Sequence, residues 1–208
     1  MVILIENQNK MNFGYENIMN IFDRKGYNFF DGNKPFNINI FGVRMKTDTN
    51  DFDDYLGVAF RDGDGEKVVH IWSATTDPGK HWLENPLNTK GTAIVVPGQY
   101  PGLWKIGKHQ GKYTALRQKG KVKVYRDNDK DAEHDLDPST IEEGKYFGIN
   151  CHRSNPKSES YMVNKWSAGC QVFKRVDDFN KLMKIAKVSA DKYGNSFTYT
   201  LLEESDFE

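Results

Sequence analysis

A cysteine and a histidine are the side chains of this sequence whose types and spacing could do covalent chemistry: Cys170 and, ahead of a polar loop, His152. A thiol attacks a carbonyl carbon as the thiolate, so it needs a base or a positive charge beside it. The loop, residues 153–165, is long enough to fold the imidazole against the thiol. The pair therefore predicts a cysteine nucleophile, Cys170, with His152 as its general base.

Small residues precede this candidate nucleophile in Ser167-Ala168-Gly169. Glycine lets the backbone come close to a substrate. We expect the N–H groups of Gly169 and Cys170 to be free to face a developing oxyanion, and the loss of one such donor costs roughly 100- to 1000-fold in turnover. Ser167 is expected to form a hydrogen bond within the turn rather than to act as a nucleophile.

The same residues also have structural interpretations. Cys170 could be a buried free cysteine, since cysteine is among the most buried residue types. Cys151 adjoins His152 on an alternating strand, so we expect its side chain to face the opposite side and to pack in the core. A metal site of Cys151, His152 and Cys170 would lack a fourth ligand and the short spacings typical of zinc, so no metal is expected.

A second candidate metal site, the acidic segment Asp127-Asn-Asp-Lys-Asp131, is similar to the start of a calcium loop. Ala132 and Pro138 stand where such a loop needs glycine and glutamate, so we expect no calcium site there. The remaining histidines have no partner that the sequence identifies, and we expect them to be surface or core residues: His70, His81, His109 and His134.

The segment Ile149-Asn-Cys-His152, the polar loop and Ser167-Ala-Gly-Cys170 together resemble the His-loop-Ser-x-Gly-Cys motif of the L,D-transpeptidase catalytic domain, the YkuD-like fold. The stretch 91–104 is loosely similar to another conserved segment of that family. The resemblance implies acyl transfer on peptidoglycan stem peptides, through a thioester, to an amine or to water. It also implies that a backbone carbonyl near Ser154 or Ser167 orients the imidazole, and that no cofactor takes part.

The sequence departs from the family motif at two positions, and both concern the contacts with substrate rather than the nucleophile. Family members commonly carry an arginine two residues after the cysteine, whereas here Cys170 is followed by Gln171 and Val172. They also often have glycine after the histidine, where this chain has Arg153. The charge contact of that arginine is therefore either absent or supplied elsewhere, for instance by Arg153 or Lys174. The residues expected to line the substrate site are Arg153, Trp166 and Gln171.

The Gly-Cys-Gln form looks like the divergent members that phages and prophages encode. The alternative hypothesis is accordingly a structural or wall-binding phage protein that keeps the fold without turnover, because a fold alone does not confer activity. Oligomeric state is left open.

Composition limits the other partners. The 208 residues carry 29 basic and 29 acidic side chains, which does not favour nucleic acid as a partner. No signal peptide and no apolar run long enough to span a bilayer are expected, so the sequence predicts cytoplasmic synthesis and no membrane partner. The cell wall would then be reached by lysis or within a virion. Two cysteines are too few for a disulfide framework. One bridge between Cys151 and Cys170 stays open as an alternative, and the expectation is a free thiol for at least one of them.

The elements that must position these residues are mainly strands. Apolar periodicity predicts helices over 11–25 and 178–193. Alternation predicts hairpins of 55–60 with 68–72 and of 113–117 with 122–125. Further strands are predicted at 36–41, 93–96, 146–152 and 197–202. The stretch 73–91 has no sustained period and is predicted to be irregular.

This pattern predicts a β-rich α+β fold, an L,D-transpeptidase-like mixed sheet or flattened barrel with flanking helices. We expect a single domain over 1–208. Its first part, residues 1–90, is a candidate accessory region of a helix and strands, and residues 90–208 are the expected catalytic core.

Overall fold

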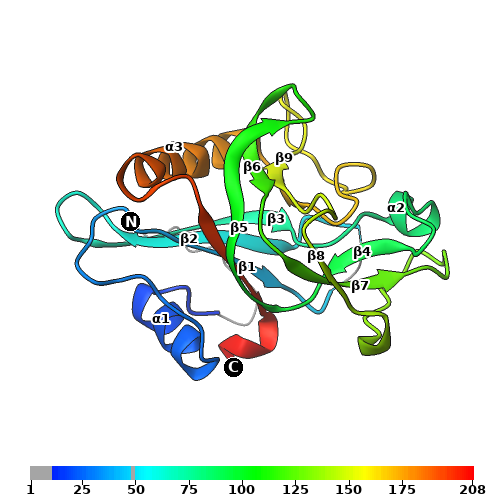
Figure 1. Ribbon diagram of the computed structural model, residues 1–208, viewed down its shortest axis with the longest axis horizontal. Coiled ribbons are helices and arrows are strands. Elements are labelled where there is room, and N and C mark those ends of the chain that lie inside the picture. Colours follow the sequence, from blue (N-terminus) through cyan, green and yellow to red (C-terminus); the bar gives the residue numbers. More distant parts are fainter. Residues whose placement is uncertain (1–10, 48–49) are drawn as a thin grey trace.

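The computed structural model describes residues 11–47 and 50–208. A closed barrel of eight strands forms its centre, in the order β1-β11-β5-β6-β9-β10-β3-β2 (Figure 1). Two neighbouring pairs, β1 with β11 and β9 with β10, are parallel, and the other pairs with a recorded register are antiparallel. The strands of the barrel are β1 (Asn39–Arg44), β2 (Asp54–Arg61), β3 (Lys67–Thr75), β5 (Gly98–His109), β6 (Tyr113–Gln118), β9 (Cys151–Arg153), β10 (Gln171–Phe173) and β11 (Phe197–Glu203).

The expected β-rich α+β class and a mixed, barrel-like sheet are thus confirmed. Strands from before and after residue 90 close the same barrel. The hairpin predicted from alternation on either side of Asp62-Gly-Asp-Gly is β2 with β3. The strand predicted at 146–152 is much shorter, because only Cys151–Arg153 pairs with neighbours.

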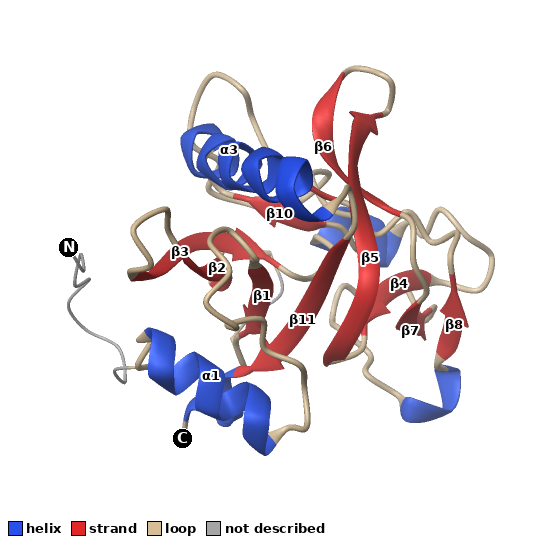
Figure 2. Ribbon diagram, turned by 60° about the vertical axis from the view of Figure 1, so that its left-hand side comes forward, coloured by secondary structure: helices blue, strands red, loops and turns tan. Residues whose placement is uncertain are grey.

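A second, three-stranded sheet has the order β4-β7-β8 and lies beside the barrel, at the right of Figure 2. Its strands are β4 (Thr92–Val95), β7 (Val122–Asp127) and β8 (Glu142–Gly144). The predicted hairpin of 113–117 with 122–125 is therefore wrong. Both segments are strands, but β6 pairs with β5 and β9 in the barrel while β7 pairs with β4 and β8, so the turn at Lys119-Gly120 leads from one sheet to the other.

Three α-helices flank the strands: α1 (Tyr15–Arg24), α2 (Lys80–Glu84) and α3 (Val176–Tyr193). Helix α1 begins after Gly14 rather than at residue 11, and buries Tyr15, Ile18, Ile21 and Phe22 along one stripe. Helix α2 lies in the stretch predicted to be irregular. Two short 3-10 helices, Pro138–Thr140 and Glu204–Phe207, complete the described elements. No helix among the described residues is long and apolar enough to cross a membrane.

The barrel interior reaches directly to the segment that carries the candidate base. Trp104 and Tyr199 are fully buried and stack with ring centroids 4.3 Å apart. The indole of Trp104 donates a hydrogen bond of 2.9 Å to the carbonyl of Ile149, three residues before His152. Aromatic packing in the core therefore fixes the backbone from which β9 begins.

Candidate active site

The candidate base and nucleophile come from the two parallel strands β9 and β10. His152 is the register partner of Val172, and Cys151 is the partner of Gln171. Side chains alternate between the faces of a strand, so Cys170, two residues before Val172, falls on the face of His152. Cys170 also packs against the buried cluster of Phe52, Val163 and Val172 on that face. Cys151 and Gln171 face the barrel interior and are fully buried.

The imidazole of His152 is buried, and its Nδ1 lies 2.8 Å from the carbonyl oxygen of Arg153. A carbonyl oxygen only accepts hydrogen bonds, so Nδ1 carries the proton and Nε2 keeps its lone pair. The expectation that a backbone carbonyl orients the ring is met, but by Arg153 rather than by Ser154 or Ser167. Burial, with a smaller contribution from His109, lowers the pKa of His152 to about 4. At neutral pH the ring is an uncharged base.

The thiol of Cys170 is half-buried and donates to the carbonyl oxygen of Gly148 at 3.3 Å. Burial raises the pKa of this thiol to about 11, against the opposing effect of the Asn150 backbone N–H. Within the described chain no hydrogen bond joins Cys170 to His152. The resting site therefore holds a neutral thiol and a neutral imidazole on the same face of the strand pair. For attack, the thiol must break its hydrogen bond with the Gly148 carbonyl oxygen and transfer its proton to Nε2 of His152.

The turn before the nucleophile is closed by Ser167. Its hydroxyl accepts from the N–H of Gly169 at 3.1 Å and donates to the carbonyl of Cys170 at 2.7 Å. Ser167 is thus a hydrogen-bonding residue of the turn, as predicted. The prediction that the Gly169 N–H is free to face an oxyanion is wrong, because that group is satisfied by Ser167. Among the described residues the N–H of Cys170 donates no hydrogen bond, so it remains the one candidate oxyanion donor of the pair.

Gly169 is required at its position for two reasons. Its φ is 112°, a conformation that favours glycine, and a Cβ there would lie 2.2 Å from the carbonyl oxygen of Ala93 on β4. The small sheet therefore presses its backbone against the nucleophile turn. This contact explains why a residue without a side chain precedes Cys170.

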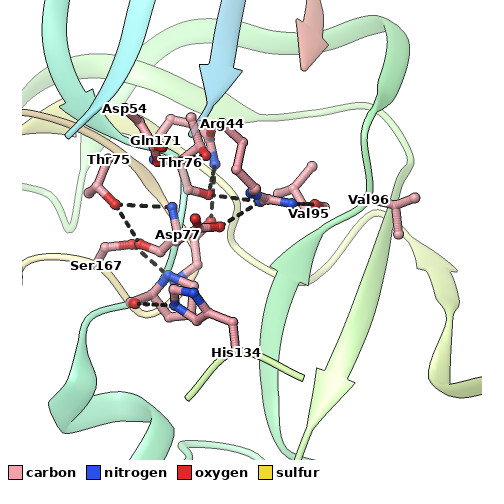
Figure 3. A network of polar contacts seen from close by, with 12 residues as sticks. Arg44, Asp54, Thr75, Thr76, Asp77, Val95, Val96, His134, Ser167 and Gln171 are labelled. Carbon is pink, nitrogen blue, oxygen red and sulfur yellow. Dashed lines mark hydrogen bonds and ion pairs between the residues drawn. The ribbon is translucent and has the colours of Figure 1, made fainter. Parts of the chain in front are cut away.

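A buried polar network supports the turn from the barrel side (Figure 3). Arg44 on β1 forms an ion pair of 2.6 Å with Asp77 and donates to the carbonyls of Val95 and, at 3.4 Å, Thr76. The carboxyl group of Asp54 accepts hydrogen bonds from the N–H and the hydroxyl of Thr76. Burial and the neighbouring Asp77 raise the pKa of Asp54 to about 8.

This network reaches the turn at two points. The side-chain amide of Gln171 donates to the carbonyl of Thr76 at 3.1 Å, and its oxygen accepts from the hydroxyl of Tyr199 at 2.5 Å. Two residues beyond Asp77, the N–H of Gly79 donates to the carbonyl of Ser167 at 2.9 Å. The end of β3 and the start of α2 thus hold both sides of the nucleophile.

The residues expected to contact substrate differ in their exposure and in the contacts that they already make. Gln171 is fully buried with both ends of its amide satisfied, so the expectation that it binds substrate is wrong. Arg153 places its guanidinium 4.1 Å above the ring of Tyr113 and donates to the Ser154 carbonyl. Trp166 is 39% exposed and remains available for contact. Lys174, the other candidate cation, pairs with Glu159 at 3.1 Å.

The remaining cysteine, Cys151, is a free thiol in the core, as its place on the strand predicted. Within residues 11–47 and 50–208, no three His, Cys, Asp or Glu side chains are grouped so as to hold a metal ion.

Sequence reasoning missed two parts of the site. His109 stacks on His152, with ring centroids 4.3 Å apart, and it follows Lys105-Ile-Gly-Lys108, whose alternation was a signal for a strand that ends there. Arg44 follows the apolar run Ile40-Phe-Gly-Val43. A cation at the end of such a strand needs a buried partner, but the sequence does not identify Asp77 as that partner.

Comparisons of the chain with protein-family models, with curated proteins and with solved structures give no match. The geometry of the site and the motif from Ile149 to Cys170 are therefore the features that point to a function.

Proposed function

We propose that this chain is a cysteine-dependent acyl-transfer enzyme acting on peptidoglycan stem peptides, of the L,D-transpeptidase or L,D-peptidase kind. One observation carries the proposal. The Nδ1–H of His152 is held by the Arg153 carbonyl, which leaves Nε2 as an uncharged base on the strand face that also carries the thiol of Cys170.

The proposed reaction follows from these two groups. The Sγ–H proton of Cys170 passes to Nε2 of His152 as Sγ bonds to the carbonyl carbon of a stem-peptide amide. The developing oxyanion accepts from the N–H of Cys170. The amide C–N bond breaks, the leaving amine takes the proton from His152, and a thioester remains on Sγ. An amine or a water then gives up a proton to Nε2, attacks the thioester carbon and releases Sγ as the thiol.

The motif from Ile149 to Cys170 supports the choice of substrate, because its order and spacing resemble the L,D-transpeptidase catalytic domain. The β-rich barrel with flanking helices is compatible with that family. Arg153 and Trp166, at the start and the end of the loop that joins the base to the nucleophile, are the proposed substrate contacts. A phage origin and delivery in a virion or by lysis remain part of the proposal.

A second candidate function is a wall-binding or structural phage protein without turnover. The raised pKa of the Cys170 thiol supports it, since a retired cysteine needs no activation. The exposed aromatic rings of Tyr161 and Trp166, both on the loop before Cys170, would suit binding to a saccharide or peptide surface.

Incubation of the protein with purified peptidoglycan and its soluble fragments, followed by mass spectrometry, tests the proposal. We expect released or newly linked stem peptides from the wild type and a loss of at least about 1000-fold in Cys170→Ala and in His152→Ala. Matched controls are Cys151→Ala, which removes the core thiol, and His81→Ala, which removes a histidine of α2. Both should retain activity.

The outcomes separate the two candidate functions. Unchanged product formation in Cys170→Ala would overturn the cysteine mechanism. No product from the wild type, combined with equal co-sedimentation of wild type and Cys170→Ala with the wall, would support the binding protein instead.

A further inference from the structure

A second histidine lies against the candidate base. The rings of His109 and His152 stack with their centroids 4.3 Å apart and their planes 28° apart. Both side chains are buried, at 8% and 5% exposure. His109 is the last residue of β5, and its register partner across the tight turn is Tyr113 on β6. The β5–β6 hairpin thus brings an imidazole to a site that is otherwise built from β9 and β10.

The contact between the two rings is made by their faces and not by a hydrogen bond. Rings inclined by only 28° do not direct an N–H of one at a nitrogen lone pair of the other. The Nδ1 of His109 is buried and has no hydrogen-bond partner among the described residues. His109 therefore acts on His152 by packing, not by passing a proton to it.

The ring of His152 needs such a restraint. Its single hydrogen bond, from Nδ1 to the Arg153 carbonyl, fixes one edge and leaves the ring free to tilt about that bond. A neighbouring ring against one face removes this freedom. With the edge and the face both held, the direction of the Nε2 lone pair is set.

We propose that His109 is a positioning residue for His152: its ring restrains the plane of that imidazole and so keeps Nε2 directed for proton transfer with Cys170. The catalytic consequence depends on the function proposed above. The restraint itself is a property of the two rings and can be measured without substrate.

Burial and the neighbouring positive charges favour the uncharged forms of His109 and His152. Burial lowers the pKa of His109, and Arg117 on β6, Lys112 in the hairpin turn and Arg153 on β9 lower it further. The titratable groups that act on His152 are His109 and Arg153, of which Arg153 carries a charge at neutral pH. Neither ring is therefore charged near neutral pH, and no repulsion opposes their contact.

Three variants test the role of the ring. His109→Ala removes it, and His109→Phe keeps a flat ring without nitrogens. His70→Ala removes a histidine that stacks on Trp72, at 5.5 Å, rather than on His152. With soluble stem-peptide substrate we expect His109→Ala to lower kcat by between about 10- and 100-fold at unchanged KM. His109→Phe should recover most of that loss, and His70→Ala should match the wild type.

A measurement that needs no turnover accompanies the kinetics. In protein with isotope-labelled histidines, the wild-type ring nitrogens of His152 should show one tautomer, with the proton on Nδ1. His109→Ala should broaden or shift these signals towards a mixture of tautomers, and His109→Phe should restore them.

Two results would overturn the proposal. Kinetics of His109→Phe as poor as those of His109→Ala would mean that a nitrogen of His109 is needed, not its ring face. Unchanged His152 signals in His109→Ala would mean that the stack restrains nothing. If the wild type shows no turnover, the proposed function fails, while the nuclear magnetic resonance comparison still decides the restraint.

Discussion

Cys170 and His152 lie on one face of the parallel strand pair β9–β10, with the thiol two residues before the register partner of the histidine. The thiol donates to Gly148 and the imidazole to Arg153, so each group is held by a backbone carbonyl rather than by the other. The resting pair is uncharged, which separates this site from those that store a preformed thiolate.

The raised pKa of Cys170 predicts slow alkylation of the resting protein. With a thiol pKa of about 11, the thiolate fraction and hence the rate with iodoacetamide should rise about tenfold per pH unit between roughly pH 7 and 10. Mass spectrometry of timed samples measures the rate at each site. Cys170→Ala is the control, because its remaining thiol, Cys151, is fully buried and should stay unlabelled. A rate already at its plateau near pH 7 would show that the pair ionises in solution.

The lowered pKa of His152 predicts that acid destabilises the protein. The folded chain keeps this ring neutral down to about pH 4, whereas the unfolded chain binds a proton near pH 6.5. Unfolding therefore takes up a proton between these values, so the free energy of unfolding falls as the pH drops through that window. The slope is up to about 1.4 kcal/mol per pH unit from this one group.

Urea denaturation at several pH values measures the effect. His152→Gln, which cannot titrate, should reduce the slope between about pH 4 and 6.5. His109 contributes with the same sign, because its pKa is also lowered, so the slope should not vanish. An equal slope in wild type and His152→Gln would contradict the assignment of a neutral buried ring.

Gly169→Ala should disrupt the nucleophile turn. The substitution places a Cβ at 2.2 Å from the Ala93 carbonyl oxygen and puts alanine at a φ of 112°. We expect a loss of more than about 2 kcal/mol in stability, together with loss of activity, measured by denaturation and by product formation. Gly63→Ala is the matched control, because its Cβ would meet only Phe36 at 4.0 Å. Equal stability of the two variants would contradict the close contact.

Arg44→Met should leave the carboxylate of Asp77 buried without its partner. Breaking a buried ion pair from one side costs about 3–5 kcal/mol, and the carbonyls of Val95 and Thr76 also lose a donor. Lys181→Met removes one half of an exposed pair with Asp178 and should cost less than about 1 kcal/mol. Thermal or urea unfolding of both variants gives the comparison. A small effect of Arg44→Met would contradict a structural role for the buried ion pair.

Local patterns in the sequence were sufficient for much of the fold. Alternation and turn residues predicted the hairpin β2–β3 and the strand β11, and the apolar stripe predicted helix α3. The start of β5 was missed because Pro101 and the glycines at 98 and 102 interrupt the alternation there. The turn at Lys119-Gly120 was identified, but no local signal says that its two strands belong to different sheets.

For the candidate active site, the sequence predicted the base, the nucleophile and the turn residues, but not the groups that contact them. The order of His152, Ser167, Gly169 and Cys170 is local information, and the turn role of Ser167 followed from its residue type. Gln171 was placed with the substrate although it points into the barrel, since a single residue of strand after a turn does not reveal its face. His109 was missed because its contact with His152 depends on how β5, β6 and β9 meet.

The turn that carries Cys170 is completed by the carbonyls of Ala93 and Thr76 and by the N–H of Gly79, all distant from it in the sequence. A fragment spanning residues 149–173 would contain the whole motif and none of these supports. The motif grafted onto another scaffold would therefore keep its sequence but lose the contacts that hold the turn in its conformation. Transfer of this nucleophile to another protein would also require β4 of the small sheet, the end of β3 and the start of α2.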